Sequence, residues 1–407
     1  MTPEVDLLRA VRAAGDRVVG FLQRLVQIPS RTGAEEQAAA LVVRELRLLG
    51  IDEVRTDGAG NVIGRLTGAT GRSVMLHAHL DVVDPGDSHA WTHPPFSGTL
   101  QDGCVWGRGS VDDKGSIVGQ VYALGLLREL GLCPPGDVFV AAAVGEEIGG
   151  LGTRHLCTQT LPDLAVIGEP SSNTLRRGHR GRFEFIVTFR GRSAHASTPQ
   201  HGANPAFALS RFLLALRQLP MAAGGDFGDS TAVPTLMYVD QTSSNVIPAA
   251  VSAHLDWRNA PSESLAQARA KVEQLAGESL EPGVTVEVGV ANRLVSSYTG
   301  LSLMVEHAVT PFWTEPDDVR LLAAQEALSG ALHRTVPVQV WPFYTDGGFL
   351  HAAGVPCIGF GPGDPAMAHV LDERMPVEQL LEATAGYMAL ALRLGEDRLW
   401  LDSVPGT

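Results

Sequence analysis

Acidic and imidazole side chains follow the short apolar runs of this sequence, where they could bind metal ions. Eight such residues lie directly after an apolar run, in the loop that follows one, or just before a predicted helix: His79, Asp81, Asp112, Asp113, Glu146, Glu147, Glu169 and His369. In an open α/β sheet, ligands bind beyond the carboxyl ends of the strands. We therefore expect five separate segments to bring carboxylate and imidazole groups to one edge of a sheet.

These residue types favour a catalytic metal site. A mixture of His, Asp and Glu without Cys suits Zn²⁺, Co²⁺ or Mn²⁺ better than a structural zinc ion, which prefers thiolates. The carboxylates outnumber the ligands that one ion needs, so the pattern predicts two ions, about 3.5–4 Å apart, that share a bridging carboxylate. A glutamate beside a ligand glutamate, as in Glu146-Glu147, is the arrangement expected of a general base that acts on activated water.

Each residue also has a simpler interpretation when it is taken alone. Glu146-Glu147 could be a solvated pair at the start of a helix, where carboxylates favour the helix dipole. His79 could be a hydrogen-bonded core histidine, and Asp112-Asp113 could form a turn or cap a helix. Only the joint placement favours the metal site. The sequence has no G-K-[ST] in its glycine-rich stretch at 145–152, no G-x-S-x-G and no recognisable cysteine nucleophile, so phosphate binding and covalent catalysis are unsupported.

Helices and strands alternate in the first and last parts of the chain, and these elements must position the acidic cluster. Apolar spacing predicts helices over 35–50, 114–130, 317–328 and 377–394. Short apolar runs predict buried strands at 61–66, 74–76, 138–144, 164–167, 336–340 and 355–360. The alternation indicates an α/β fold with a mixed, mostly parallel sheet flanked by helices.

The pattern changes between residues 180 and 290. The expected order there is strand, helix, strand, strand, helix, strand, over 182–190, a helix opened by Asn204-Pro205, 233–240, 246–258, 262–280 and 284–290. This order is that of a ferredoxin-like domain. The simplest organisation is one α/β domain, formed by 1–178 and 296–407, with an inserted α+β domain at 179–295.

Charge and composition exclude several classes of protein. The 407 residues include 45 acidic and 31 basic ones, a net charge of −14 without a Lys/Arg block, which argues against a nucleic-acid or anionic-membrane surface. The longest apolar stretch, residues 138–144, is far shorter than the ~20 residues of a membrane helix. The N-terminus is expected to form an amphipathic helix and lacks the apolar core of a signal peptide. Four cysteines without C-x-x-C spacing are expected to be free, buried thiols of a cytoplasmic protein.

The acidic cluster lies within motifs that resemble those of the M20 metallopeptidases, a family that includes acetylornithine deacetylase, succinyl-diaminopimelate desuccinylase, aminoacylase and glutamate carboxypeptidase. The H-x-D signature matches MLHAHLDVV at 75–83, and the next block matches WTHPPFSGTLQDGCVWGRGSVDDKG at 91–115. Further matches follow in the family's order: VGEEIGG at 144–150, IGEP at 167–170, RGRSAHAS at 190–197, SNVIP at 244–248, DWR at 256–258, TDGGF at 345–349 and AHVLDE at 368–373. The resemblance implies a zinc-exopeptidase-like domain with two divalent ions per subunit, zinc above all with cobalt or manganese as alternatives. It also implies an inserted lid that forms a homodimer.

The resemblance implies a role for each matched residue of the cluster. The ligands would be, for one ion, His79, Asp112 and Glu169, and, for the other, Glu147, His369 and the same Asp112. Asp112 would therefore bridge the ions, and its peptide bond to Asp113 would be cis. Asp81 would hold the imidazole of His79 in the correct tautomer.

The remaining matches imply the catalytic and substrate-binding groups. Glu146 resembles the general base, which would take a proton from the activated water and pass it to the leaving amine. His195 in the lid resembles the residue that reaches into the neighbouring subunit's site and stabilises the oxyanion. Arg258 and Asn245 resemble the anchors of the substrate's carboxylate and backbone, a task that suits a guanidinium group.

The expected activity is hydrolysis of the amide bond of an N-acyl-amino acid by a cytoplasmic di-metal enzyme. A dipeptidase or carboxypeptidase of the same family stays open, as does, more remotely, a non-catalytic binding protein on the same fold. The desuccinylases usually have Arg-Arg-Gly-Ser where this chain has His-Arg-Gly-Arg at 179–182, which argues against a succinyl pocket. The sequence AHVLDE is closer to the deacetylase pattern, but the acyl group itself stays open.

Overall fold

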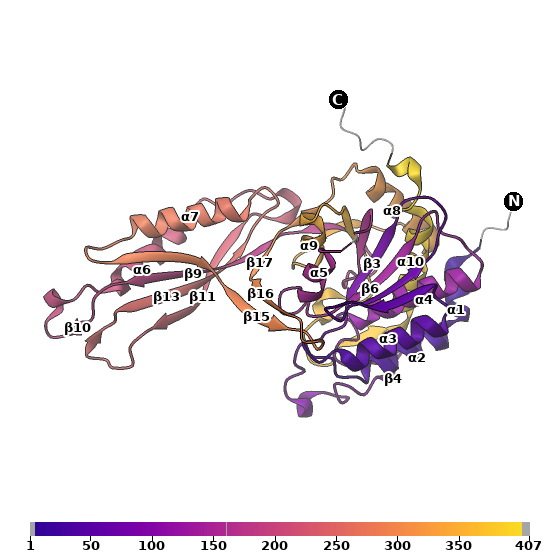
Figure 1. The fold of residues 1–407 in the computed structure, drawn as a ribbon, viewed down its shortest axis with the longest axis horizontal. Coiled ribbons are helices and arrows are strands. Elements are labelled where there is room, and N and C mark those ends of the chain that lie inside the picture. The colour runs from indigo at the N-terminus through magenta and orange to yellow at the C-terminus, as the bar shows by residue number, and fades with distance from the viewer. Residues whose placement is uncertain (1–4, 160, 401–407) are drawn as a thin grey trace.

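The computed structural model describes residues 5–159 and 161–400, which form two bodies joined by extended segments (Figure 1). The larger body is built on a nine-stranded mixed sheet. Its strands, in spatial order, are β1 (Glu53–Thr56), β2 (Val62–Leu66), β6 (Val138–Ala143), β3 (Val74–His79), β7 (Leu164–Ile167), β20 (Cys357–Gly359), β8 (Leu175–His179) and β18 (Phe312–Trp313), with β19 (Val338–Trp341) also paired to β8. The central strands β6, β3, β7 and β20 run parallel, as the sequence predicts.

Helices cover both faces of this sheet. The larger layer packs on the side chains of one face and contains α1 (Leu7–Ala13), α2 (Gly15–Val26), α3 (Glu36–Leu48), α4 (Lys114–Glu129), α8 (Val319–Ala331) and α10 (Val377–Arg393). The shorter helices α5 (Leu151–Leu156) and α9 (Gly347–Ala352) pack on the other face. A small sheet of β4 (Thr99–Gln101), β5 (Cys104–Trp106) and β21 (Arg374–Pro376) completes this body. The α/β class is confirmed.

The second body, which we call the lid, contains a five-stranded antiparallel sheet with two helices on one face (Figure 1). The elements follow in the predicted order: β9 (Arg182–Arg190), α6 (Pro205–Leu216), β11 (Thr231–Val239), β13 (Ala250–Arg258), α7 (Leu265–Glu278) and β14 (Thr285–Val290), and β17 (Ala308–Val309) pairs with β9. Alternate residues of β9 and β13 are buried against α6 and α7. The predicted cap is present, because Asn204 accepts a hydrogen bond from the backbone N–H of Ala206.

Several details differ from the sequence-based expectations. The predicted strand at 246–258 is two strands, because Pro248 interrupts it: β12 (Val246–Ile247) pairs with β10 (Ala194–His195), and β13 starts at Ala250. The N-terminal helix is divided into α1 and α2. All four cysteines are free, but only Cys357 is buried, so the expectation of four buried thiols is wrong: Cys104 and Cys157 are half-buried and Cys133 is exposed.

A hairpin after the lid sheet was not predicted. It consists of β15 (Asn292–Ser296) and β16 (Ser302–Glu306) and packs against the larger body. Tyr298 at its turn donates a hydrogen bond to the carbonyl of Gly60. The division of the chain at residues 179 and 296 stays a prediction. No helix among the described residues is long and apolar enough to span a membrane.

Candidate metal centre and active site

The acidic cluster lies at the carboxyl ends of three neighbouring parallel strands. His79 is the last residue of β3, Glu146 and Glu147 follow β6, and Glu169 follows β7. Asp112 comes from the segment that leads into α4, and its peptide bond to the next residue is cis, as the resemblance implies. The predicted convergence of separate segments at one sheet edge is therefore present.

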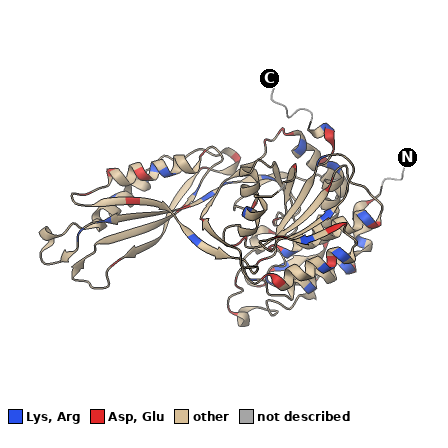
Figure 2. Cartoon of the chain, viewed as in Figure 1, with Lys and Arg blue, Asp and Glu red and all other residues tan. Residues whose placement is uncertain are grey.

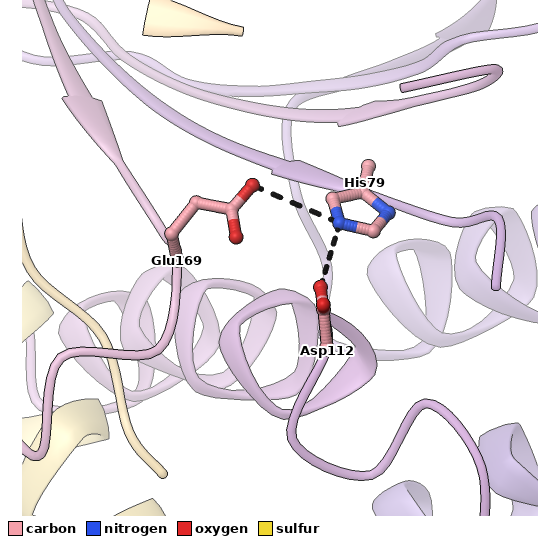
Figure 3. A group of neighbouring side chains, drawn as sticks. All are labelled: His79, Asp112 and Glu169. Atoms are coloured by element: carbon pink, nitrogen blue, oxygen red, sulfur yellow. Dashed lines mark hydrogen bonds and ion pairs between the residues drawn. The ribbon is translucent and has the colours of Figure 1, made fainter. Parts of the chain in front are cut away.

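Five of these side chains form two groups that share Asp112. The first contains His79, Asp112 and Glu169 (Figure 3), and the second contains Asp112, Glu147 and His369. Within each group, one ligand atom from each residue lies within 4.8 Å of the others. These two groups of three side chains are the ligand sets that the resemblance implies for two metal ions.

The two oxygens of Asp112 face different imidazoles, which is the geometry of a bridging ligand. Oδ1 is 3.0 Å from Nε2 of His79, and Oδ2 is 3.2 Å from Nε2 of His369. Oε1 of Glu147 lies 3.1 Å from the same nitrogen of His369, and Oε1 of Glu169 lies 3.7 Å from Nε2 of His79. Three carboxylates and two imidazoles, without a thiolate, fit two divalent cations of the Zn²⁺, Co²⁺ or Mn²⁺ type.

Burial makes this concentration of negative charge costly without cations. Burial raises the pKa of Glu169 well above its usual range. The pKa of Asp112 is instead held low, because hydrogen bonds with His369 and His79 outweigh its burial. A hydrogen bond with Asp112, in turn, raises the pKa of His369 to about 10. Divalent cations would supply the positive charge that the protonated imidazoles supply here.

Asp81 holds both His79 and the loop that carries Glu146 and Glu147 in place. Its carboxylate accepts hydrogen bonds from the backbone N–H groups of Glu146 and Glu147, at 3.0 and 3.2 Å, and from the hydroxyl of Thr32 at 2.7 Å. Nδ1 of His79 donates to the backbone carbonyl of Asp81 at 2.9 Å and lies 3.5 Å from its carboxylate. Nδ1 therefore carries a proton, and a cation bound by Nε2 would replace the proton that Nε2 shares with Asp112.

Glu146 is buried beside the metal-ligand cluster and does not belong to either group of three. Burial raises the pKa of Glu146 well above its usual range, and the carboxylates of Asp346 and Glu147 raise it further. A raised pKa suits a group that takes a proton from water and then delivers it to an amine.

Asp346, in the matched motif TDGGF, is a site residue for which the sequence predicts no role. Its Oδ2 accepts a hydrogen bond from the hydroxyl of Thr153, which is 2.7 Å from Nε2 of buried His77. Its Oδ1 faces the glutamate loop so closely that a Cβ at Gly150 would lie only 2.6 Å away, and Gly150 has φ +71°. A glycine is needed there because the loop turns tightly against Asp346.

Glu373 was also missed, although it ends the matched AHVLDE motif. It is fully buried, and its Oε2 accepts a hydrogen bond from Arg108 at 2.6 Å. Its Oε1 accepts from the backbone N–H groups of Val111 and Asp112, at 2.8 and 3.0 Å. Glu373 thus fixes the backbone that presents Asp112. Only the tertiary structure reveals this role, because the two segments lie far apart in the sequence.

The lid residues divide into two sets. His195 lies on β10, at the end of the lid far from β3 and β6 (Figure 1), so it does not join the cluster of its own chain. Asn245 lies next to His195, since the carbonyl of Asn245 accepts a hydrogen bond from the backbone N–H of Ala196. Arg258, at the base of the lid, has its guanidinium 5.9 Å from the ring of Tyr344. Arg258 alone among these three lies next to the larger body.

The buried carboxyl group of Glu35, whose pKa responds to the charge of Asp81, makes the stability of the protein depend on pH. Both of its carboxyl oxygens are buried without a hydrogen-bond partner among the described residues. Burial raises the pKa of Glu35 from 4.5 to about 7, and the charge of Asp81 adds to the rise. The folded chain therefore keeps a proton that the unfolded chain releases, and the free energy of unfolding falls as pH rises from 4.5 to about 7.

We expect Glu35→Gln to remove this loss of stability. The free energy of unfolding of each protein is measured by urea denaturation. The difference between variant and wild type should shift in favour of the variant by roughly 2–3 kcal/mol from pH 5 to pH 8. Glu36→Gln, at the exposed neighbouring position, is the matched control and should track the wild type. If Glu35→Gln shows the same pH dependence as the wild type, Glu35 does not bind a proton in the folded protein.

Comparison with known proteins gives one consistent family. The model of peptidase family M20/M25/M40 matches residues 75–393. A succinyl-diaminopimelate desuccinylase from Cereibacter sphaeroides is 30% identical over 91% of this chain and 97% of its own length. Aminopeptidase PepT from Bacillus cereus superimposes with a TM-score of 0.75, at 20% identity, over 94% of this chain and 99% of its own. A dinuclear metal-binding M20 peptidase from Bacillus subtilis superimposes with a TM-score of 0.68, at 17% identity, over 94% and 98%.

Proposed function

Since the chain belongs to peptidase family M20/M25/M40 and is a hydrolase of amide or peptide bonds, we propose that it cleaves N-acyl-amino acids with two divalent cations, zinc in the first place. The observation that carries the proposal is the shared Asp112, whose oxygens face two ligand groups beside the buried Glu146. The ligands would be His79, Asp112, Glu147, Glu169 and His369.

The cations would supply a water of lowered pKa and polarise the amide carbonyl. Glu146 would take the proton from that water and return it to the leaving amine, and its burial keeps bulk water from competing for the proton. Asp81 holds the backbone of this glutamate through the loop hydrogen bonds described above. Arg258 would bind the carboxylate of the substrate.

The hinge supports an acyl group other than succinyl. His179 is fully buried, with Nδ1 2.8 Å from the carbonyl of Arg180 and Nε2 3.0 Å from the hydroxyl of Thr345. Burial lowers the pKa of His179 to about 4, so the imidazole is neutral at pH 7. A neutral, fully bonded imidazole offers no cation to a succinyl carboxylate.

A substrate panel tests the proposal and separates it from its rivals. Purified protein with added Zn²⁺ or Co²⁺ is assayed against N-acetyl, N-formyl and N-succinyl amino acids and against dipeptides. We expect the acetyl or formyl compounds to be cleaved fastest. Faster cleavage of dipeptides would favour the alternative, a dipeptidase or carboxypeptidase. Two bound ions without turnover of any compound would favour a binding protein.

We also propose that the enzyme is a homodimer formed through the lid. The strand β11 is an edge of the lid sheet, and its exposed apolar side chains are Val233, Leu236, Met237, Tyr238 and Val239. Phe207 and Leu214 of α6 are exposed as well, and β11 carries no charge (Figure 2). Pairing of this edge with a second copy would cover these side chains. A dimer would also bring His195 and Asn245 of one subunit toward the cluster of the other. We further propose a cytoplasmic location.

Complementation tests the contribution of His195 across the dimer. His195→Ala and Glu147→Ala should each lose nearly all activity. After subunit exchange, half of the sites of a hybrid dimer lack both groups and the other half lack neither, so mixing equal amounts should restore a measurable part of the wild-type rate. Exchange is verified with differently tagged subunits. No recovery despite exchange would show that His195 acts in its own chain or not at all.

A further inference from the structure

Two guanidinium groups share one carboxylate at the base of the lid. Arg182 is the first residue of β9 and Arg258 is the last residue of β13, and these antiparallel neighbours bring them to the same end of the sheet. Nε of Arg182 donates to Oδ2 of Asp256 at 2.8 Å, and Nε of Arg258 donates to Oδ1 at 2.6 Å. Asp256 therefore holds both guanidinium groups in fixed positions.

This arrangement leaves hydrogen-bond donors for an anion. Within the described part of the chain, neither Arg182 nor Arg258 uses its Nη1 atom in a hydrogen bond. Glu184 lies 3.6 Å from Nη2 of Arg182, but both of its oxygens already accept hydrogen bonds, from Nδ1 of His254 and of His307 at 2.8 Å. Two arginines are balanced by Asp256 and Glu184, so the arrangement offers a carboxylate the two Nη1 donors of its guanidinium groups rather than a surplus of charge.

The pair faces the catalytic site through Tyr344. The guanidinium of Arg258 lies 5.9 Å from the centre of the tyrosine ring. Burial raises the pKa of Tyr344, the charge of Glu146 raises it further, and the charges of Arg182 and Arg258 oppose the rise. Tyr344 precedes by two residues Asp346, whose carboxylate lies against Gly150 of the loop that carries Glu146, so the segment 344–346 joins the arginine pair to the catalytic site.

We propose that Arg182 determines substrate specificity, because together with Arg258 it binds the free carboxylate of the N-acyl-amino acid. This proposal rests on the proposed function as an amide hydrolase. Asp256 would position both donors and would not itself contact the substrate. The pattern of the desuccinylases has a serine at this position, so the second guanidinium distinguishes this chain from those enzymes. The substrate consequence is a strong requirement for a free carboxylate over an amide or an ester.

Binding to a protein that does not turn over isolates this effect. In the metal-loaded Glu146→Gln protein, binding of N-acetylglycine and of N-acetylglycinamide is measured by calorimetry, with and without Arg182→Gln. We expect Arg182→Gln to weaken the binding of N-acetylglycine about 10- to 100-fold, since it removes a charge-assisted hydrogen bond. The affinity for N-acetylglycinamide should change less than 2-fold. Arg182→Lys should recover part of the loss. Arg190→Gln, at the exposed far end of β9, is the control and should change neither.

The outcomes separate this proposal from the proposed function. Equal weakening of both probes would make Arg182 merely structural, and no weakening of N-acetylglycine would remove it from the carboxylate site; either result overturns the proposal. Failure of both probes to bind the parent protein would overturn it as well. The substrate panel with wild-type protein then shows independently whether amide hydrolysis itself survives.

Discussion

Replacing Glu146 by Gln should lower kcat by about 10²–10⁴-fold, the usual contribution of a general acid–base residue. The amide keeps the shape of the side chain but cannot take a proton from water. Because Glu146 lies outside both ligand groups, the variant should still bind two metal ions per chain. Turnover of the best N-acyl-amino acid and elemental analysis of the same sample measure the two effects together.

The control for this variant is Glu129→Gln, at the end of α4. Glu129 pairs with Arg17 on the surface, and its side chain is 41% exposed. Its activity should equal that of the wild type. Full activity of Glu146→Gln would show that another group moves the proton, and Asp346 would then be the first candidate because of its effect on the pKa of Glu146.

Replacing Asp112 by Asn should have an equally large effect through a different cause. One neutral amide would replace the carboxylate that both ligand groups share, and the site would lose one negative charge of three. We expect fewer than two ions per chain after dialysis and a rate below 1% of the wild type, an order-of-magnitude expectation for the loss of a bridging ligand. Metal content and turnover are again measured on one sample.

Asp84→Asn is the matched control, because Asp84 is exposed and its contacts are an ion pair with Arg31 and a hydrogen bond from the N–H of Gly86, both outside the ligand groups. It should keep both ions and full activity. Two tightly bound ions in Asp112→Asn, with wild-type turnover, would mean that Asp112 does not bridge them.

Local sequence patterns predicted the site's framework because its residues follow the strand ends. His79 ends one strand, and Glu147 and Glu169 follow two others. The apolar runs of all three strands are visible in the sequence, so sheet topology alone brings these residues together. His369 lies in a loop with φ +63°, and its pairing with Glu147 across the site depends on tertiary packing. For that pairing, the motif resemblance was needed.

Supporting residues could not be predicted in the same way. Glu373 and Asp346 accept hydrogen bonds from segments that lie more than 190 residues away in the sequence, and neither has a local pattern that distinguishes it from a surface acid. The break at Pro248 was missed because apolar residues continue on both sides of it. The hairpin of β15 and β16 was missed because its exposed Leu294 and Met304 obscure the alternation expected of a surface strand.

A metal titration of the metal-free wild-type enzyme shows whether amide hydrolysis depends on two bound cations. Activity toward the best N-acyl-amino acid is followed as Zn²⁺ or Co²⁺ is added, with bound metal measured in parallel. We predict no turnover without metal and a rate that reaches its maximum at two bound ions per chain. Full turnover in the metal-free protein, or no turnover of any amide with two ions bound, would contradict the account.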